Sequence, residues 1–471
     1  MLKHIFKFNT FKFYFKKKNL KNRSHKILES FIKPFKATPP ICKAPWVSIS
    51  IGMDGTISPC CYTINYDRNN EKAKWGKYAI KEIWESEIFQ IYRKSIKSGL
   101  LPDACSICRD KIARKEFSSL KTQEFVRFNH KTKTPLIIEL SVDNTCNLEC
   151  IMCNSINSSK IASIKNSGFK GINNYERLFI ELKEYIPKLE EMIFTGGEPF
   201  LSKFYFRLWN EIIETNPNCK ITLNTNCTVL SKEAKEIIEK ANFSFNVSID
   251  SFNKKTYESI RKNADFETTL NNFKYLVNYS ARKEVPLAVA VCPLKQNYKD
   301  IPELINICNQ YGAFVHFVHV FGAQNSALSN AGVNTLNLAL RILENNTPLS
   351  ETETEQLNLQ EYNSLIEDIK QWKENNTIIE TKLSEINTQE ENDKYINDLI
   401  NIKTKLNKKQ QEQLETAINC LPENYKNGIL IDVISSIPHI RLINYLEILP
   451  EDEIAEYLGE LFRSNILNIK Y

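Results

Sequence analysis

Short apolar runs alternate with helical patterns from Pro135 to about residue 322. The runs are residues 136–142, 189–195, 220–225, 243–249, 286–292 and 313–320. Runs of this length that are rich in Ile, Val and Phe predict strands, and their alternation with helices predicts a parallel sheet. Five right-handed crossovers curl such a sheet toward a barrel, so the pattern predicts an α/β fold with a partial (β/α)6 barrel. Ligands are expected at the carboxyl ends of the strands.

Other segments flank this barrel pattern. Residues 39–115 are rich in Cys and predict a small α+β domain, and residues 116–134 form a Lys-rich linker. Strand patterns vanish after residue 322, so residues 323–471 predict a separate helical region, in which residues 374–418 are exposed helix or linker. One predicted helix carries an apolar face at helical spacing, made of Leu359, Tyr362, Ile366, Ile369 and Trp372.

Residues 1–38 form an arm in which Phe, Tyr and Ile are interleaved with Lys. The first 40 residues hold eleven Lys and Arg against one acid, so they contribute +10 to a chain whose net charge is +6, and the remainder is −4. Such an arm suits a solvated or docking segment, or an amphipathic helix that touches an anionic surface. An acidic body without a recognisable RNA-binding module argues against nucleic acid as a partner.

Composition indicates a folded, multidomain chain without a membrane span. The 471 residues are 42% hydrophobic and 25% charged, and a chain of this length forms two to four domains. We find no apolar run long enough to span a bilayer and no apolar core of a secretory signal, so we expect a cytoplasmic protein. Thirteen cysteines, an odd number, argue for reduced thiols and grouped metal ligands rather than a disulfide framework.

The first cysteine group directly follows the first predicted strand. The segment DNTCNLECIMC places Cys146, Cys150 and Cys153 in a C-x3-C-x2-C array. Three thiolates at this spacing can hold three irons of one [4Fe–4S] cluster and leave the fourth iron without a protein ligand. An open iron can chelate a small molecule, as an open position does in catalytic zinc sites. Zinc is the weaker interpretation, because no nearby His supplies a fourth ligand.

This array and the segments after the next strands resemble the radical S-adenosylmethionine (SAM) superfamily over residues 135–322. The second strand ends in TGGEP, the segment that binds the methionyl ammonium of SAM in that family. The resemblance implies that Gly196 and Gly197 let the backbone approach the ligand closely and that Glu198 offers its carboxylate to the amino group.

The resemblance extends to the third and fourth strands. Asn224 and Asn226 end the third strand near the expected ribose, and Ser248, in VSID, with Arg261 resembles the pair that holds the SAM carboxylate. Taken singly, each of these polar residues could instead cap a helix, and for Ser248 or Asp250 the two interpretations are equally good. Together and in this order they are specific.

Two residues depart from the family pattern. Met152 stands before the third cysteine, where the family often has an aromatic residue against the adenine, although a thioether can also pack on a purine. Cys227 replaces the Gly that commonly follows Asn226. Neither departure removes a cluster ligand, so the resemblance still implies reductive cleavage of SAM to methionine and a 5′-deoxyadenosyl radical that abstracts a substrate hydrogen.

A second cysteine group precedes the barrel: Cys42, Cys60, Cys61, Cys105 and Cys108. The segments around Asp54-Gly55 predict a β-hairpin with a two-residue turn, in which Cys60 faces Ile49. The Trp after the first cysteine, DGxxxPC and the distant CxxC resemble the SPASM/twitch auxiliary-cluster domain, here placed before the barrel.

That resemblance implies one auxiliary [4Fe–4S] cluster on Cys42, Cys60, Cys105 and Cys108, with Cys61 as a spare or substitute ligand. A structural zinc site with four cysteine ligands is the alternative. If the auxiliary cluster accepts an electron from the substrate, the hairpin and the CxxC loop should cover the open side of the barrel at the carboxyl ends of the strands.

Few other residues qualify as catalytic. Cys292 ends the fifth strand on the rim where barrel enzymes carry function, and is a weak candidate. His316 and His319 lie on opposite faces of the sixth strand, so only one can face the barrel interior, and a structural role is favoured for both.

The sequence therefore predicts a radical SAM enzyme with help from an auxiliary cluster, oxidising a sugar-like, cyclitol-like or peptide substrate. Its implied partners are SAM, a reductant such as flavodoxin or ferredoxin, and an unidentified substrate. Two alternatives are a peptide- or protein-modifying enzyme with redox-neutral chemistry and a non-catalytic iron–sulfur or zinc scaffold. RNA modification through the basic arm is a third.

Overall fold

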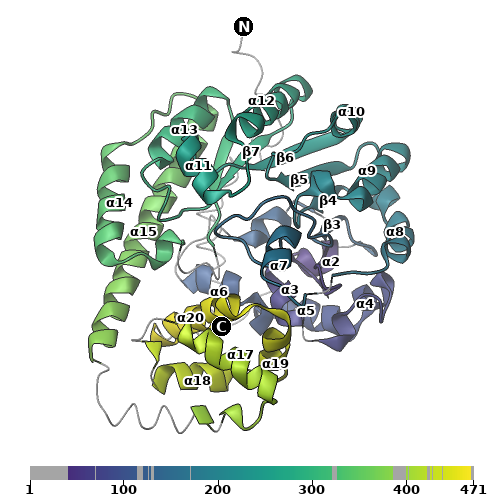
Figure 1. Cartoon of the computed structure of the whole chain (residues 1–471). Helices are drawn as coiled ribbons and strands as arrows, with labels where there is room; N and C mark the ends of the chain where they lie inside the picture. The colour runs from purple at the N-terminus through teal and green to yellow at the C-terminus, as the bar shows by residue number, and fades with distance from the viewer. Residues whose placement is uncertain are drawn as a thin grey trace. The chain divides into compact units, whose positions relative to one another are not determined.

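The structure is a computed structural model that describes most of the chain from residue 41 to residue 467 (Figure 1). The described residues are 41–68, 70–113, 120–125, 127–128, 132–169, 171–320, 326–385, 399–400, 402–421, 425–426, 428–437 and 439–467. The predicted arm, residues 1–38, lies outside them, as does part of the predicted linker. None of the helices in these residues is both long and apolar enough to cross a membrane.

Two compact units divide the described residues. The first takes its residues from Met1–Thr145, Lys170–Val247 and Thr269–Leu287, and the second from Cys146–Phe169, Ser248–Thr268 and Ala288–Tyr471. The division therefore separates the cysteine loop at 146–153 from the strand that precedes it.

The first unit is built on a mostly parallel sheet. Its strands are β1 (Ser48–Ile51), β2 (Ile57–Ser58), β3 (Ile137–Leu140), β4 (Glu191–Phe194), β5 (Lys220–Thr225) and β6 (Asn242–Ser248), in the order β2-β1-β3-β4-β5-β6. Only β2 runs antiparallel to its neighbour. Its helices are α2 (Ala44–Val47), α3 (Ile64–Asp67), α4 (Ile80–Glu85), α5 (Glu87–Lys97), α6 (Ser106–Ala113), α8 (Tyr175–Lys183), α9 (Lys203–Thr215), α10 (Lys232–Lys240) and most of α12 (Phe266–Lys283).

The core of the first unit forms where alternating strands meet amphipathic helices. Along β5 every second side chain is buried, as the two-residue period of a strand requires. The helix α9 buries Tyr205, Leu208, Trp209 and Ile212, which are three or four residues apart. Trp209 meets aromatic rings of β4 and β6 edge to face, so aromatic packing fixes α9 on the sheet.

The second unit carries two parallel strands and most of the remaining helices. The strands are β7 (Leu287–Val291) and β8 (Phe314–Phe317), paired in parallel. The helices are α7 (Ser159–Ile164), α11 (Lys254–Ile260), α13 (Ile301–Gln310), α14 (Val333–Asn345), α15 (Glu353–Glu385), α17 (Lys408–Asn419), α18 (Gly428–Ser436), α19 (His439–Ile448) and α20 (Glu451–Ile466). All six predicted strands, β3 to β8, are confirmed, and the mixed α/β fold is the one that the partial barrel predicted.

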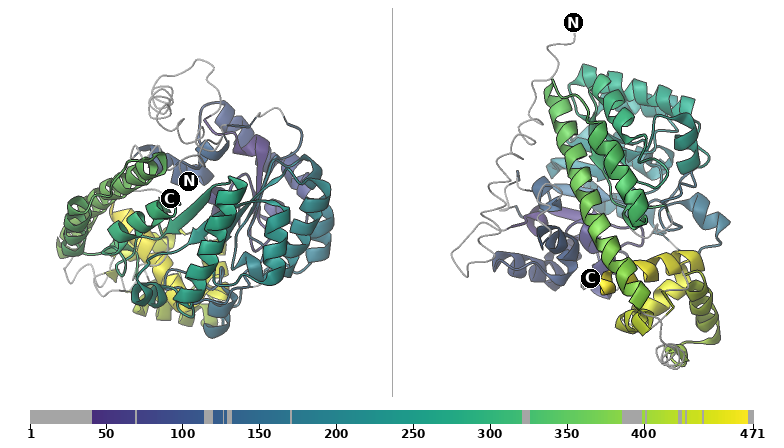
Figure 2. Two further views of the ribbon diagram at one scale, coloured as in Figure 1. Left: turned by 90° about the horizontal axis from the view of Figure 1, so that it is seen from above. Right: turned by 90° about the vertical axis from the view of Figure 1, so that its left-hand side faces the viewer.

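The helix α15 is the long light-green helix in the right-hand view of Figure 2, and it packs along α14 and β8. Its predicted apolar face is confirmed, since Tyr362 and Ile369 are fully buried. The Asn358 side chain replaces a neighbouring strand at the edge of β8: its Oδ1 accepts from Val315 N at 2.8 Å and its Nδ2 donates to Ala313 O at 3.0 Å.

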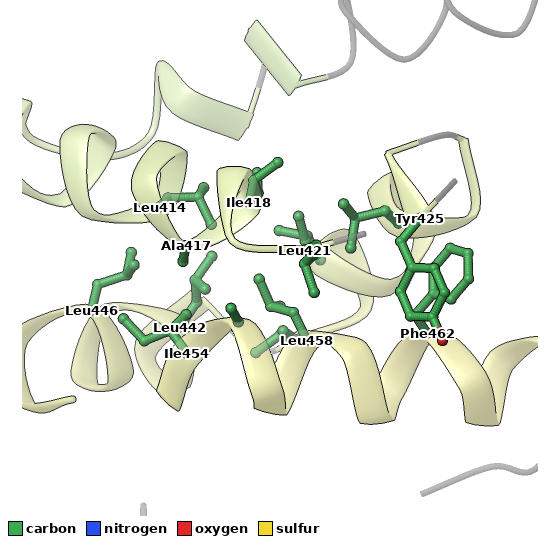
Figure 3. Close-up of a cluster of buried hydrophobic side chains, with 14 of the residues drawn as sticks. Leu414, Ala417, Ile418, Leu421, Tyr425, Leu442, Leu446, Ile454, Leu458 and Phe462 are labelled. Carbon is green, nitrogen blue, oxygen red and sulfur yellow. The ribbon is translucent and has the colours of Figure 1, made fainter. Parts of the chain in front are cut away.

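A separate apolar core holds α17, α18, α19 and α20 together (Figure 3). Leu414 of α17, Leu446 of α19, and Leu458 and Phe462 of α20 are all fully buried in it. Tyr425 stacks on Phe462 with the ring centroids 4.3 Å apart. The predicted helical C-terminal region therefore contains a folded bundle with its own core.

The N-terminal hairpin differs from its prediction in two respects. Ile51 pairs with Ile57, and Gly52 N donates to Thr56 O at 2.8 Å, so the loop has three residues and the predicted pairing of Cys60 with Ile49 is wrong by one position. Gly55 has φ +77°, which is the left-handed conformation that closes a three-residue hairpin loop. In addition, β1 pairs in parallel with β3, so the hairpin extends the barrel sheet rather than forming a sheet of its own.

Candidate functional site

The cysteine loop of the second unit is held by backbone hydrogen bonds on both sides. Glu149 N donates to Lys262 O at 3.1 Å and Ile151 N donates to Ile260 O at 3.0 Å, which ties the loop to the end of α11. On the other side, Cys146 N donates to the Ser159 hydroxyl at 3.1 Å. Met152 is half-buried in the turn that Cys153 N closes on Cys150 O at 2.9 Å.

The three thiols of this loop share one electrostatic environment. Burial raises the pKa of Cys150 to about 11, although Arg261 opposes the rise, and burial raises the pKa of Cys153 to about 12. Charge on Cys146 raises both pKa values further, and charge on Cys150 also raises the pKa of Cys153. The structure therefore brings the three predicted ligands close together, in surroundings where thiolates need a bound cation to compensate them.

Arg261 forms a buried ion pair beside the cysteine loop. Its Nη2 lies 2.8 Å from Asp250 Oδ2, and the two side chains are 8% and 0% exposed. Its Nη1 points at Cys150 Sγ at 3.9 Å. The sequence predicted Arg261 as a ligand of the SAM carboxylate and considered Asp250 only as a helix cap, so the charge partner of Arg261 was missed, although VSID contains it.

Cys292 lies in the same set of groups. Its backbone N donates to Asp250 Oδ1 at 2.8 Å. Burial raises the pKa of the Cys292 thiol, and charge on Asp250 raises it further while Arg261 lowers it. A neutral thiol next to an ion pair is a poor nucleophile, so the catalytic role of Cys292 stays a prediction. Ser248 is half-buried at the end of β6, and its role as a ligand of SAM is also a prediction.

In the first unit, the two glycines of TGGEP contact the backbone that leads to the cysteine loop. Gly196 has φ +124°, and a Cβ on it would lie 2.5 Å from Asp143 O. A Cβ on Gly197 would lie 2.6 Å from the carbonyl carbon of Asn144. Gly197 N donates to Asp143 O at 3.0 Å and Glu198 N donates to Thr145 O at 2.8 Å. The two glycines are thus needed for the close approach of this loop to the backbone of residues 143–145. Their predicted close approach to a ligand stays a prediction.

Glu198 joins the ends of two strands. Its Oε1 accepts from Thr225 Oγ1 at 2.8 Å and from Phe200 N at 3.1 Å, and its Oε2 accepts from Asn226 N at 2.7 Å. The side chain is buried, at 1% exposure. Glu198 therefore fixes the carboxyl end of β5 against the loop after β4, and its predicted role toward an ammonium group would add to this structural one.

The asparagines predicted near the ribose have different surroundings. Asn224 Oδ1 accepts from Asn246 Nδ2 at 2.8 Å across neighbouring strands. Asn226 Oδ1 accepts from the backbone N and the hydroxyl of Thr228, at 2.9 and 2.7 Å. Cys227, between Asn226 and Thr228, has φ +61°. The backbone is left-handed there, and any residue with a Cβ is strained by about 1–2 kcal/mol. This strain explains why Gly is common at this position in the family.

The auxiliary cysteines also come together in the first unit. Burial raises the pKa of Cys42, and charge on Cys60, Cys105 and Cys108 raises it further. Burial likewise raises the pKa of Cys60 to about 12. These four thiols are the four predicted ligands, and their mutual repulsion as thiolates fits a site that is completed by a metal cluster.

Cys61 stands apart from that set. Burial raises its pKa, and Glu139 is the charge that raises it most, while Lys121 lowers it. Lys121 Nζ lies 2.8 Å from Glu124 and 3.9 Å from Glu139. A half-buried lysine beside the spare cysteine was not expected from the sequence, because nothing in a Lys-rich linker distinguishes this lysine from its neighbours.

The auxiliary cysteines lie at the amino ends of the strands. Cys42 and Cys60 share a buried apolar cluster with Ile137, the first residue of β3. The parallel strands β1 and β3 start together at Ser48 and Ile137, and the antiparallel β2 leads back to that end. The tip of the hairpin itself, residues 52–56, follows the carboxyl end of β1, and Met53 Cε lies 3.4 Å from the position of a Cβ on Gly196 in the loop after β4. The hairpin therefore reaches the carboxyl ends of the strands as expected, whereas the auxiliary cysteines lie at the opposite ends, against the expectation.

No three His, Cys, Asp or Glu side chains in the described part of the chain are already arranged to hold a metal ion. Thiols lose their protons and converge as the metal binds, so a preformed set is not required. The ligand sets of both cysteine groups stay predictions, and their donor chemistry fits iron–sulfur clusters.

Two family models match the chain over the regions just described. The model of the radical SAM superfamily matches residues 140–308. The model of an iron–sulfur cluster-binding domain, SPASM, matches residues 42–109.

Curated relatives match over part of their length. A probable GTP 3′,8-cyclase of Methanocaldococcus jannaschii is 26% identical over 191 residues, which are 38% of this chain and 57% of that protein. The GTP 3′,8-cyclase of Aliarcobacter butzleri is 25% identical over 198 residues, 40% of this chain and 58% of that protein. The chain thus spans less than three fifths of these relatives.

Among solved structures, Streptococcus suis SuiB bound to the precursor peptide SuiA has a TM-score of 0.34 and 14% identity, over 56% of this chain and 61% of that one. The anSMEcpe structure with bound AdoMet has a TM-score of 0.34 and 16% identity, over 44% of this chain and 59% of that one.

Proposed function

Because the chain is a member of the radical SAM superfamily with an iron–sulfur cluster-binding domain, we propose that it cleaves SAM reductively and removes a hydrogen atom from a substrate. The cofactors of such an enzyme are a SAM-binding [4Fe–4S] cluster and auxiliary iron–sulfur. The observation that carries the proposal is the loop of Cys146, Cys150 and Cys153, whose half-buried thiols interact electrostatically and whose Cys150 Sγ lies 3.9 Å from Arg261 Nη1. When bound, the cluster supplies the electron that splits the bond from sulfur to C5′ of SAM.

The chain's own residues position and shield this chemistry. Cys146, Cys150 and Cys153 hold the cluster, and Arg261 places a positive charge next to Cys150 while its own charge is balanced by Asp250. Within the first unit, Glu198 fixes the carboxyl end of β5 through Asn226 N. The Arg261 and Asp250 side chains are 8% and 0% exposed, so they shield their side of the cysteine loop from water.

The finer proposal concerns the reaction outcome. Oxidation of a sugar-like, cyclitol-like or peptide substrate uses the auxiliary cluster as electron acceptor, and the four convergent auxiliary thiols support the presence of that cluster. Their place at the amino ends of β1 and β3 removes the geometric argument that the sequence offered for this role. Redox-neutral modification of a peptide is therefore the competing proposal, and a low-potential flavodoxin or ferredoxin is the proposed reductant for either.

SAM cleavage tests the core of the proposal. Anaerobically reconstituted protein given dithionite and SAM should release 5′-deoxyadenosine and methionine, and Cys146→Ala, Cys150→Ala or Cys153→Ala should abolish the release. Cys219→Ala is the matched control, because Cys219 is a buried cysteine directly before β5 that belongs to neither predicted ligand set. Release that persists in all three loop variants would refute the proposal and favour the scaffold alternative.

Metal analysis tests the auxiliary site. Two [4Fe–4S] clusters predict about eight irons and eight sulfides per chain, and the pair Cys105→Ala and Cys108→Ala should lose about half of each while SAM cleavage persists. Stoichiometric zinc with four irons would identify a structural zinc site instead. If the variant without the auxiliary iron still turns over a substrate, the electron-acceptor role is ruled out.

A further inference from the structure

The C-terminal helix α20 contacts the segment that directly follows the cysteine loop. Ser155, two residues after Cys153, donates from its backbone N to Glu453 Oε1 at 2.7 Å and from its hydroxyl to Glu453 Oε2 at 2.8 Å. Both residues are buried, Ser155 at 0% and Glu453 at 6% exposure. One carboxylate thus binds both donors of one serine across 298 positions of sequence.

Two further contacts hold the same segment. Lys165, at the end of α7, pairs with Asp452 at 2.6 Å and with Glu453 at 3.2 Å. The Ser167 hydroxyl donates to Ile448 O at 3.0 Å. Contacts at residues 155, 165 and 167 therefore attach this whole stretch to the ends of α19 and α20.

The stretch is also bonded to the cysteine loop itself. Ser158 caps α7 and donates from its hydroxyl to Leu148 O at 2.9 Å, and Ser159 accepts from Cys146 N at 3.1 Å. Cys153 and Ser155 are two residues apart, so their Cα atoms are separated by at most about 7 Å. Only Asn154 separates Ser155 from Cys153, so a displacement of Ser155 acts directly on the end of the loop that carries Cys153.

We infer that Glu453 is a positioning residue for the SAM cluster: the C-terminal helical bundle fixes the loop of Cys146, Cys150 and Cys153 through the Glu453–Ser155 contact. The inference rests on the proposed function for the cluster, but the contact itself does not. It gives the helical region, which the sequence left without a role, a direct effect on the first cysteine site.

Four single variants of the full chain separate this role from a general effect on stability. Glu453→Ala removes both acceptors, and Ser155→Ala removes only the hydroxyl donor. Glu453→Gln keeps both hydrogen bonds, because its amide oxygen accepts from Ser155 N and its amide N donates to the serine oxygen. The matched control is Gln410→Ala, which removes a 3.0 Å hydrogen bond to Glu447 inside the same bundle and does not touch the loop.

Two readouts are measured on each protein: hydrogen exchange of residues 150–161, and the EPR spectrum of the reduced SAM cluster with and without SAM. Losing a hydrogen bond to a charged group should speed exchange at Ser155 by about tenfold or more in Glu453→Ala. Ser155→Ala should show a smaller increase, and Glu453→Gln should match the wild type. The EPR signal should likewise change most in Glu453→Ala, less in Ser155→Ala and not in Glu453→Gln. Gln410→Ala should leave both readouts as in the wild type.

The outcomes separate the inference from the proposed function. Unchanged exchange and EPR in a folded Glu453→Ala protein, or equal changes in Gln410→Ala, would overturn the inference while wild-type SAM cleavage persists. If Glu453→Ala does not fold, Ser155→Ala decides by the same readouts. A wild type that binds no cluster at residues 146–153 overturns the proposed function and the inference with it, even if exchange at Ser155 responds.

Discussion

Removing Asp250 should destabilise the protein strongly, because it leaves the buried guanidinium of Arg261 without a charge partner. The two groups are 2.8 Å apart, a separation at which unit charges attract by about 6 kcal/mol at an effective dielectric constant of 20. Desolvation of both groups offsets much of that attraction in the intact pair. Once one partner is gone, the desolvation cost of the other remains, and such truncations cost about 3–5 kcal/mol.

The loss of a second hydrogen bond adds to this effect, since Asp250 Oδ1 accepts from Cys292 N. We therefore expect Asp250→Ala to lower the free energy of unfolding by at least about 3 kcal/mol. Replacing both partners, as Asp250→Ala with Arg261→Met, should cost clearly less than the sum of the single variants, because no buried charge is left unpaired.

Urea unfolding followed by circular dichroism measures the four members of this cycle. Glu239→Ala is the control, because it breaks the exposed pair with Arg282 at 2.6 Å and should change stability far less. The reasoning that this ion pair is buried and mutually dependent would be refuted if Asp250→Ala lowered the free energy of unfolding by less than about 1 kcal/mol. It would also be refuted if the effect of the double variant equalled the sum of the effects of the two single variants.

Three further predictions concern the backbone and one carboxylate. Gly197→Ala places a Cβ against a backbone carbonyl and should cost about 3 kcal/mol by thermal unfolding, whereas Gly332→Ala, whose Cβ would make only an ordinary contact with Glu380 Oε1 at 3.8 Å, should cost much less; equal losses would contradict the close approach. Cys227→Gly should be near neutral and Cys227→Val should be destabilised by about 1–2 kcal/mol, because a β-branched residue fits the left-handed conformation poorly; the reverse order of melting temperatures would contradict this. Burial raises the pKa of Glu456 to about 7, so the folded state binds the proton on Glu456 more tightly than the unfolded state does. The protonated carboxyl therefore contributes to the free energy of unfolding fully below pH 4.5, and this contribution, at most about 3 kcal/mol, is lost as the pH rises through 7. Glu456→Gln should therefore be more stable than the wild type at pH 8 and equal to it at pH 4, and parallel pH profiles would refute the assignment.

The strands could be predicted from sequence because each is a short apolar run between clear breaks, and residues 220–225 were predicted with the bounds that β5 has. The cysteine loop could be placed directly after β3 because its three cysteines are close together in sequence, while their role as ligands stays a prediction. The hairpin loop was not, since Asp54-Gly55 satisfies the signal of a two-residue turn, while the positive φ of Gly55 serves equally well as the last residue of a three-residue loop.

Contacts between distant residues could not be predicted. Ser155 and Glu453 are ordinary polar residues in their own segments, and only folding brings them together. The pairing of β1 with β3 joins residues that are almost 90 positions apart, and no local pattern specifies it. Asp250 is an intermediate case, because the sequence marks it as part of a motif but not as the partner of Arg261.

The contact of Asn358 with β8 has a consequence for the behaviour of the protein at high concentration. A strand with open amide and carbonyl groups at its edge invites pairing with a strand of another molecule, and soluble proteins avoid this by covering or disrupting such edges. Here one side-chain amide occupies Val315 N and Ala313 O and the long helix α15 stands alongside (Figure 2). The helix thereby blocks sheet growth between molecules, so Asn358→Ala should promote aggregation before any loss of chemistry is seen.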